Sequence, residues 1–236
     1  MSGLKNWDNK TWVSSANYIK SFTRFILKQN KLNRDSKILD IGCGRGKIIA
    51  NISTKKGLKN KPIGIDLENN YDIDKRIIFK KINALYFFKY NKKNFDLILI
   101  KQTIHLFKIK EILKLLNFCK KSLTSNGKIF ILSLDSYKNE LPVFKEMKKK
   151  LIISLNRNKK IIDLILKANP KTILKKYVFK AEVYKKKYIN MIRKRYISIL
   201  LNLNSNQIEK GVNEINFNYK NVIKFNDKLV CLIIKK

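Results

Sequence analysis

Residues 38 to 46 decide the fold: Ile38-Leu39-Asp40-Ile41-Gly42-Cys43-Gly44-Arg45-Gly46. A short apolar run that ends in closely spaced glycines predicts a buried strand followed by a tight loop. Glycine lets the backbone turn sharply and approach a ligand without a Cβ in the way. The next segment, Lys47 to Thr54, has the pattern of a helix, and a helix N-terminus favours a carboxylate or a phosphate. This stretch therefore predicts a ligand-binding loop between a strand and a helix.

An acid at the end of the next strand completes the unit. Pro62 to Leu67 is a second apolar segment, and Asp66 stands at its end, twenty residues after Gly46. A carboxylate there can accept hydrogen bonds from both hydroxyls of a ribose. The dinucleotide fingerprint is G-x-G-x-x-G, whereas the glycines here follow G-x-G-x-G and Asp40 precedes them. The ordered set predicts a nucleoside site of a different kind.

Strand and helix patterns alternate along the chain, which predicts an α/β fold with a parallel sheet and right-handed crossovers. Continuous apolar runs are typical of strands covered on both faces, and helical spacing marks the segments between them. The expected strands are Lys37 to Ile41, Pro62 to Leu67, Arg76 to Ile82, Phe95 to Ile100, Lys128 to Leu134 after a turn at Ser125-Asn126-Gly127, Thr172 to Val183, and a final strand or hairpin over Asn221 to Lys235 with Asn226-Asp227 near its turn. The expected helices are Asn17 to Gln29, Lys47 to Thr54, Lys110 to Leu123, one or two over Leu141 to Leu166, Tyr184 to Leu203, and Ser205 to Phe217.

These elements predict one domain over residues 1–236 with four regions. Residues 1–34 form an N-terminal helical lid, 35–134 the cofactor-binding core, 135–170 a helical insertion between strands five and six, and 171–236 the C-terminal strands and helices. Ser14 or Ser15 can cap the first helix and Ser205 the last. The segment from Trp7 to Tyr18 either folds over the ligand or is a plain packing helix. Insertions on such sheets often build the substrate pocket, because ligands bind outside the carboxyl ends of the strands.

The glycine stretch resembles that of the class I S-adenosylmethionine-dependent methyltransferases, and the wider pattern is similar to their type 11-like group. The resemblance covers roughly residues 35 to 135 and continues through Ile63-Gly64-Ile65-Asp66, Phe95-Asp96-Leu97-Ile98-Leu99, His105 and Gly127-Lys128-Ile129-Phe130-Ile131-Leu132. It implies a doubly wound, mostly parallel seven-stranded sheet of the Rossmann-like methyltransferase type. It also implies S-adenosyl-L-methionine as the cofactor.

The same resemblance assigns roles around the cofactor. In the family the glycine loop holds the methionine part, and the residue at the position of Asp66 holds the ribose. The family acid beside the adenine matches Asn83-Ala84, where Asn83 keeps its hydrogen-bonding capacity but loses the charge. The residues expected at the cofactor are Asp40, Gly42, Cys43, Gly44, Gly46, Asp66, Leu67, Asn83, Ala84 and Lys101.

Fewer residues are candidates for the acceptor side. His105, the one histidine, follows the fourth strand and is either the general base or a packing residue. The stretch Tyr188 to Ser198 resembles an Arg- and Ser-containing helix of some type 11 members, which would place Arg195 and Ser198 at the acceptor. The alternative is an exposed basic helix. Tyr18 is a third candidate for acceptor contact, whereas Cys43 fits a small filler better than a nucleophile.

The charge balance is strongly basic. Lys and Arg number 53 against 17 Asp and Glu, a formal net charge of +36. Such a field attracts nucleic acid, anionic membranes or acidic ligands. The alternative origin is codon bias, because the lysines are spread over the whole chain among many Asn and Ile residues.

Cysteine usage and hydropathy bear on location. The three cysteines, Cys43, Cys119 and Cys231, are widely spaced without metal-ligand pairing. We therefore expect no metal site, and we expect the protein to be in a reducing compartment. Residues 1–13 lack the apolar run of a secretory signal, and no apolar run approaches the roughly 20 residues of a membrane span. These patterns predict a cytoplasmic protein, with oligomeric state left open.

Three functions follow from the pattern. The first is methyl transfer by in-line displacement to a small-molecule acceptor, and if this acceptor is anionic, Arg193 or Arg195 would orient it. The second is an RNA- or ribosome-associated methyltransferase, which the net charge favours. Against it, Ile100-Lys101-Gln102-Thr103 lacks the Asn/Asp-Pro-Pro-aromatic run usual in enzymes that methylate base amino groups. The third is a catalytically silent nucleoside-binding module. The acceptor atom, whether oxygen, nitrogen, carbon or sulfur, stays open.

Overall fold

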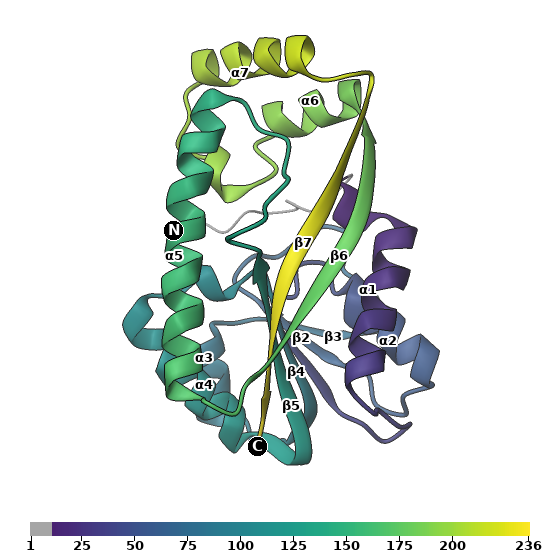
Figure 1. The fold of residues 1–236 in the computed structure, drawn as a ribbon. Coiled ribbons are helices and arrows are strands. Elements are labelled where there is room, and N and C mark those ends of the chain that lie inside the picture. The colour runs from purple at the N-terminus through teal and green to yellow at the C-terminus, as the bar shows by residue number, and fades with distance from the viewer. Residues whose placement is uncertain (1–10) are drawn as a thin grey trace.

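A seven-stranded sheet runs through the computed structural model, which describes residues 11–236. Its strand order is β3-β2-β1-β4-β5-β7-β6 (Figure 1). Strands β1 to β5 run parallel to one another, whereas β7 is antiparallel to both β5 and β6. The strands are β1 (Ile38–Ile41), β2 (Ile63–Asp66), β3 (Ile78–Lys81), β4 (Phe95–Lys101), β5 (Leu123–Leu134), β6 (Ile173–Tyr184) and β7 (Val222–Lys235). The expected doubly wound, mostly parallel seven-stranded fold is confirmed.

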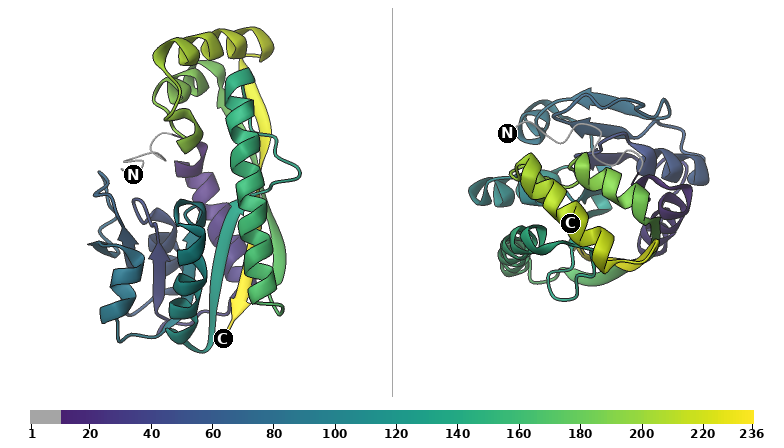
Figure 2. Two further views of the ribbon diagram at one scale, coloured as in Figure 1. Left: turned by 90° about the vertical axis from the view of Figure 1, so that its left-hand side faces the viewer. Right: turned by 90° about the horizontal axis from the view of Figure 1, so that it is seen from above.

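Helices cover both faces of this sheet (Figures 1 and 2). One face carries α1 (Ala16–Gln29) and α2 (Lys47–Lys56), and the other carries α3 (Ala84–Tyr90), α4 (Ile109–Lys121) and α5 (Lys145–Ala168). Three short 3-10 helices lie at η1 (Trp12–Ser14), η2 (Ile104–Leu106) and η3 (Ser198–Leu200). Because successive strand side chains point to opposite faces, Leu97 packs in the α1–α2 core and Ile98 in the α3–α4 core.

A helical cap stands beyond the sheet, between β6 and β7. It consists of α6 (Lys185–Arg193), η3 and α7 (Ser205–Asn218), and the long strands β6 and β7 rise to meet it (Figure 1). The 24-residue helix α5 joins cap and sheet, because a helix of that length spans about 36 Å. Its residues Met147 and Leu151 belong to the core that includes the cap, whereas Ile161 and Ile165 belong to the core on the sheet.

Several predicted elements are wrong in detail, and pairing or capping explains each one. Ser125-Asn126-Gly127 is not a turn, because β5 already begins at Leu123 and the shift in its register with β4 absorbs these residues. The last segment is one strand without a turn at Asn226-Asp227, since Asp227 pairs with Phe179 inside the β6–β7 ladder.

The helix predictions need similar corrections. Asn204, not Ser205, caps α7, by accepting the backbone N–H of Gln207 in a capping box. The helix expected over Tyr184 to Leu203 ends at Arg193, and Leu141 to Leu166 holds a single helix that begins at Lys145. Helix α3 was not expected at all. As expected, helices lie both between strands five and six (α5) and between strands six and seven (the cap).

Two negative findings concern residues 11–236. None of their helices is long and apolar enough to cross a membrane. Within the same residues, no three His, Cys, Asp or Glu side chains gather closely enough to hold a metal ion.

Candidate functional site

Three glycines with positive φ shape the loop between β1 and α2. Their φ angles are +74° at Gly42, +54° at Gly44 and +69° at Gly46, a region that residues with a Cβ rarely adopt. A Cβ at Gly42 would lie 2.2 Å from Thr103, and one at Gly46 would lie 2.2 Å from Ile77. A Cβ at Gly44 would meet nothing within 4 Å. Packing therefore requires the outer two glycines, while the middle one faces open space in which a ligand can approach the backbone.

Two carboxylates flank this loop. Asp66 ends β2, and its two oxygens accept the backbone N–H groups of Gly44 at 2.8 Å and Glu68 at 3.1 Å. Each oxygen keeps a second lone pair for a ribose hydroxyl, so Asp66 both shapes the loop and remains able to bind. Asp40 in β1 is 4% exposed, and its Oδ1 has no hydrogen-bond partner. Burial raises the pKa of Asp40 to about 7, although Lys101 opposes the shift.

A small hollow lies against the loop. It encloses about 50 Å³ and is lined by Val13, Ser14, Ile19, Asp40, Gly42, Cys43, Gly44, Lys47, Ile48 and Lys101. One wall is therefore the glycine loop and the first turn of α2, and the opposite wall is η1 with the start of α1. Ser15 caps α1 by accepting the backbone N–H of Tyr18, as expected for a serine at this end. Of residues 1–34, which were expected to form a lid, residues 1–10 lie outside the described residues.

The residues expected at the adenine lie beside the ends of β2 and β3. Leu67 is 54% exposed directly after Asp66, which suits an apolar contact with a flat base. The side-chain oxygen of Asn83 accepts the backbone N–H groups of Leu85 and Tyr86 as the N-cap of α3. The side chain of Ala84 is buried in the core under α3. Asn83 thus has a structural role that its residue type alone explains.

Lys101 marks the carboxyl end of β4. Its Nζ lies 5.2 Å from the ring centroid of Tyr18 and 5.5 Å from that of Phe22, distances at which an ammonium is attracted to an aromatic face. Tyr18 is fully buried, and its hydroxyl has no hydrogen-bond partner. The next residue, Gln102, has a φ of +52°, a strained backbone of the kind that gathers at functional sites.

The other acceptor-side candidates lie farther from the hollow. His105 in η2 is largely buried, and burial together with Arg157 lowers its pKa to about 4. Arg195 donates from its Nη2 to the carbonyl of Leu203 at 3.1 Å, and Ser198 is half-buried at the start of η3. None of these three lines the hollow at the glycine loop.

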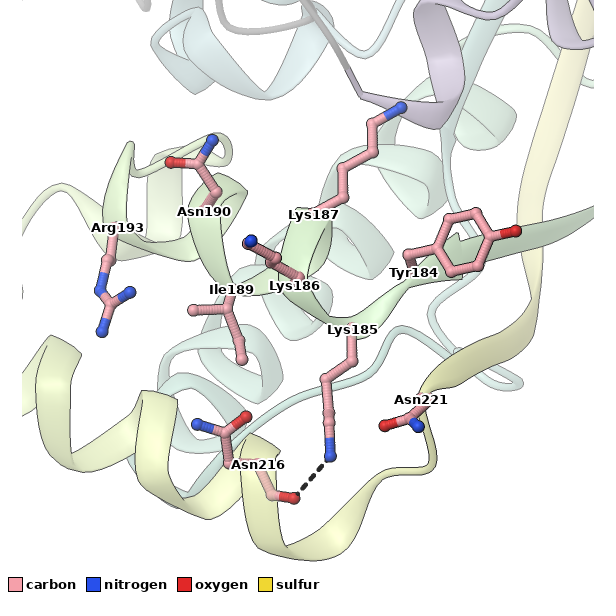
Figure 3. Close-up of a pocket in the computed structure, with 9 residues that line it drawn as sticks. All are labelled: Tyr184, Lys185, Lys186, Lys187, Ile189, Asn190, Arg193, Asn216 and Asn221. Atoms are coloured by element: carbon pink, nitrogen blue, oxygen red, sulfur yellow. Dashed lines mark hydrogen bonds between the residues drawn. The ribbon is translucent and has the colours of Figure 1, made fainter.

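An open basic groove occupies the cap (Figure 3). Its volume is about 850 Å³, and its lining residues are Tyr184, Lys185, Lys186, Lys187, Ile189, Asn190, Arg193, Asn216 and Asn221. Lys185 turns to α7, where its Nζ donates to the carbonyls of Asn216 and Tyr219. Arg193 forms a bidentate pair with Glu209 at 2.9 and 2.7 Å. The groove shares no lining residue with the hollow at the glycine loop.

Two residues that the sequence did not single out lie next to the hollow. Trp12 in η1 donates from its indole Nε1 to Asp227 Oδ2 at 2.9 Å, and both residues are buried. The Trp12 ring also contacts Tyr196 of the cap edge-on, with 5.6 Å between ring centroids. A buried aspartate in the middle of a strand is unusual. The sequence would have shown this unusual aspartate only if the last segment had been predicted as one strand without a turn.

Comparisons with known proteins agree with this geometry. A family model described as a methyltransferase domain matches residues 14–165. No curated protein matches the chain. Among solved structures, the plantazolicin methyltransferase BpumL, in complex with a monoazolic desmethylPZN analog and SAH, is 17% identical with a TM-score of 0.54, covering 98% of this chain and 88% of that chain.

Two further structures are similar. A putative methyltransferase from an antibiotic biosynthesis pathway of Anabaena variabilis is 14% identical with a TM-score of 0.64, covering 91% of this chain and 96% of that chain. A SAM-dependent methyltransferase from Archaeoglobus fulgidus is 18% identical with a TM-score of 0.52, covering 94% and 95%. At such identities the likeness concerns the fold. The family match ends before β6, so the cap lies outside it.

Proposed function

This chain belongs to the methyltransferase domain family and is a class I S-adenosylmethionine-dependent methyltransferase, and from that premise we propose that it methylates a small-molecule acceptor held between the glycine loop and the cap. One observation carries the proposal. The loop is partly covered, because Val13 and Ser14 of η1 line the hollow beside it and the ring of the adjacent Trp12 contacts Tyr196 of the cap. An enclosed site of this kind suits a small acceptor better than a large surface.

The residues around the loop fit the cofactor. The orphaned Oδ1 of Asp40 is placed to accept from the amino group of the methionine part, and Gly44 leaves room for that part beside the backbone. Asp66 would hold the ribose and Leu67 the adenine. Lys101 would face the methionine carboxylate, since it lines the same hollow. Of the N-terminal region, Val13, Ser14 and Ile19 would cover the bound cofactor, since they line the hollow, whereas Phe22 and Ile26 of α1 pack in the core.

Methyl transfer from this cofactor needs no covalent intermediate with the protein. The bound cofactor supplies a methyl group that is already activated on a sulfonium. The side chains must hold the acceptor atom in line with the carbon–sulfur bond and exclude water, and such positioning alone supplies much of the acceleration. His105 is neutral at physiological pH by its lowered pKa and could accept a proton, but its place outside the hollow gives this role less support than a packing role.

A second candidate acceptor is RNA, and the basic groove on the cap is the observation that favours it. Four of its nine lining residues are Lys or Arg, and none is acidic. A small anionic acceptor has less support, because Arg193 is already paired with Glu209 and Arg195 donates to Leu203. The cap lies outside the family match, so acceptor choice is expected to depend on it.

Methyl transfer to fractionated extract separates the two candidates. Purified protein would receive S-adenosylmethionine with a radiolabelled methyl group and either the small-molecule or the RNA fraction of source-cell extract. We expect label in the small-molecule fraction, and none with an Asp66→Ala variant. Label that enters RNA and disappears on ribonuclease treatment would overturn the small-molecule proposal. Calorimetric titration with S-adenosylmethionine, S-adenosylhomocysteine and NAD tests the cofactor assignment separately.

A further inference from the structure

Four aspartates are buried in the described part of the chain, and they differ in how well they are paired: Asp40, Asp74, Asp135 and Asp227. Asp74 accepts three hydrogen bonds from Arg76, two of them from the guanidinium. Asp135 accepts two backbone N–H groups of the loop that follows it. A buried carboxylate needs such partners, because removing it from water is costly. These two aspartates are therefore explained by structure alone.

The other two buried aspartates have fewer hydrogen-bond partners, and Lys101 acts electrostatically on both. Asp40 has an oxygen without any partner. Within residues 11–236, the hydrogen bond that Asp227 accepts comes from Trp12 Nε1 alone. A carboxylate offers about four lone-pair sites, and the Trp12 indole occupies one of those of Asp227. Lys101 faces both carboxylates and opposes the rise in pKa that burial imposes on each.

Aromatic rings surround Asp227. Trp12 meets Phe225 at 5.0 Å between ring centroids and Tyr196 at 5.6 Å, both edge-on. The carboxylate also raises the pKa values of Tyr18, Tyr177 and Tyr196, although burial is the larger cause for each. These hydroxyls therefore lie within electrostatic reach of Asp227. The rings already hold one ammonium, since Lys101 Nζ stands over Tyr18. Carboxylate and aromatic faces together make a site that favours a cation.

The position of this cluster relates it to methyl transfer. Trp12 covers Asp227, and the next two residues of η1, Val13 and Ser14, line the hollow at the glycine loop. Lys101 connects the hollow with the surroundings of Asp227, because it lines the hollow and acts electrostatically on Asp227. Asp227 thus lies behind the hollow on the side of the cap, where the acceptor is expected under the proposed function.

We propose that Asp227 binds the acceptor and that the acceptor offers an amine nitrogen. This inference rests on the proposed function and narrows it to an amine attached to an aromatic or apolar body. In the complex, the ammonium replaces the Trp12 indole at Asp227 and lies against the rings of Tyr18 and Tyr196.

The ammonium must lose a proton before its nitrogen can attack the methyl group. Asp227 takes one proton from the ammonium, which leaves a neutral nitrogen with a free lone pair. In a buried site a neutral acid and a neutral amine are favoured over two separated charges. The lone pair bonds the methyl carbon while the carbon–sulfur bond breaks and its electrons stay on sulfur. The methylated ammonium then leaves, and the proton on Asp227 passes to solvent.

The test measures binding, so it needs no knowledge of the natural acceptor. The protein, saturated with S-adenosylhomocysteine, is titrated calorimetrically with 2-phenylethylamine, 2-phenylethanol and 3-phenylpropanoate, which share one aromatic body. The variants are Asp227→Asn, which keeps an oxygen for Trp12 Nε1, and Asp135→Asn as the matched loss of another buried carboxylate. Trp12→Phe serves as a second variant that removes the competing donor and leaves Asp227 in place.

We expect the wild type to prefer the amine over the alcohol and the carboxylate. Asp227→Asn should weaken amine binding at least tenfold and change the affinity for S-adenosylhomocysteine less than twofold, whereas Asp135→Asn should change neither. Trp12→Phe should keep or strengthen amine binding. No amine binding by the wild type, equal binding of amine and alcohol, or amine binding unchanged in Asp227→Asn would each overturn the inference. Failure to bind S-adenosylhomocysteine would instead count against the proposed function.

Discussion

Gly44 and Gly57 form a natural pair for testing how the loop binds its cofactor. Gly44 has a φ of +54° and Gly57, the C-cap of α2, a φ of +58°. A Cβ at Gly44 would meet nothing within 4 Å, and one at Gly57 would come no closer than 4.0 Å to Arg34. Alanine at either position therefore suffers backbone strain without a clash. The two substitutions differ in one respect, which is that only Gly44 lines the hollow.

The strain predicts the stability change. Holding a residue with a Cβ in the left-handed region costs about 1–2 kcal/mol, and for a chain of this size each kcal/mol lowers the melting temperature by about 2–4 °C. Gly44→Ala and Gly57→Ala should therefore each lower the melting temperature by about 2–8 °C, measured without cofactor because a ligand would add its own stabilisation.

Cofactor binding should separate the pair. The new methyl group of Gly44→Ala would occupy the space where the cofactor approaches the backbone, so its affinity for S-adenosylhomocysteine should fall at least tenfold, or about 1.4 kcal/mol. Gly57→Ala should bind within twofold of the wild type in the same calorimetric titration. Unchanged binding by Gly44→Ala would refute the assignment of this space to the cofactor. An equal loss in Gly57→Ala would show that strain, not contact, weakens binding.

Three further predictions concern titration and reactivity. The imidazole of His105, the one histidine in the chain, should show no NMR titration until the pH approaches about 4, because burial lowers its pKa to that value. Its folded pKa lies below the unfolded value, so His105→Asn should lessen the loss of stability between about pH 6.5 and about pH 4. Cys43 should react first with a thiol reagent and be protected by S-adenosylhomocysteine, since it lines the hollow while Cys119 and Cys231 are buried. Asp74→Asn should lower the free energy of unfolding by about 2 kcal/mol at neutral pH, because Arg76 holds the pKa of Asp74 at about 2, and this difference should fade from about pH 4 to about pH 2.

Each of these has a control. A His105 titration near its ordinary pKa would contradict its burial in η2. Cys43→Ser should abolish the fast thiol reaction, and a reaction that persists would place the accessible thiol elsewhere. Asp35→Asn removes a carboxylate of an exposed pair with Lys59 and should leave stability nearly unchanged. A loss as large as that of Asp74→Asn would show that net charge, rather than the Arg76 contact, determines the difference.

Local pattern was enough for the cofactor-binding half of the molecule. The glycines between Ile41 and Lys47, and Asp66 at the end of the next strand, depend on backbone conformation and on one carboxylate at a strand end, which are short-range properties. The strand runs are apolar because both sheet faces are covered, so their residue types alone predict burial. The resemblance to class I methyltransferases rested on these same residues, and the family match confirms it.

Turn chemistry misled where pairing partners were distant in sequence. Asn226-Asp227 has the composition of a turn, yet β6 pairs along the whole of β7 and keeps the segment extended. Ser125-Asn126-Gly127 likewise becomes part of β5, through a register shift against β4. The adenine contact expected of Asn83 stays a prediction, and its side-chain oxygen also caps α3, a helix that the sequence did not predict. In the two strand segments, pairing between elements outweighed the local preference.

The sequence by itself determined the glycine loop, the acid at Asp66, the alternation of strands and helices, and the family, because all of these depend on neighbours within a few residues. Only the tertiary structure decided which residues from distant segments meet behind the loop. Trp12 and Asp227 are 215 positions apart, and no residue near either one in the sequence predicts that they meet. Their hydrogen bond exists because η1 folds back over β7 and excludes water there, and burial of this kind is a property of the assembled core rather than of any one segment.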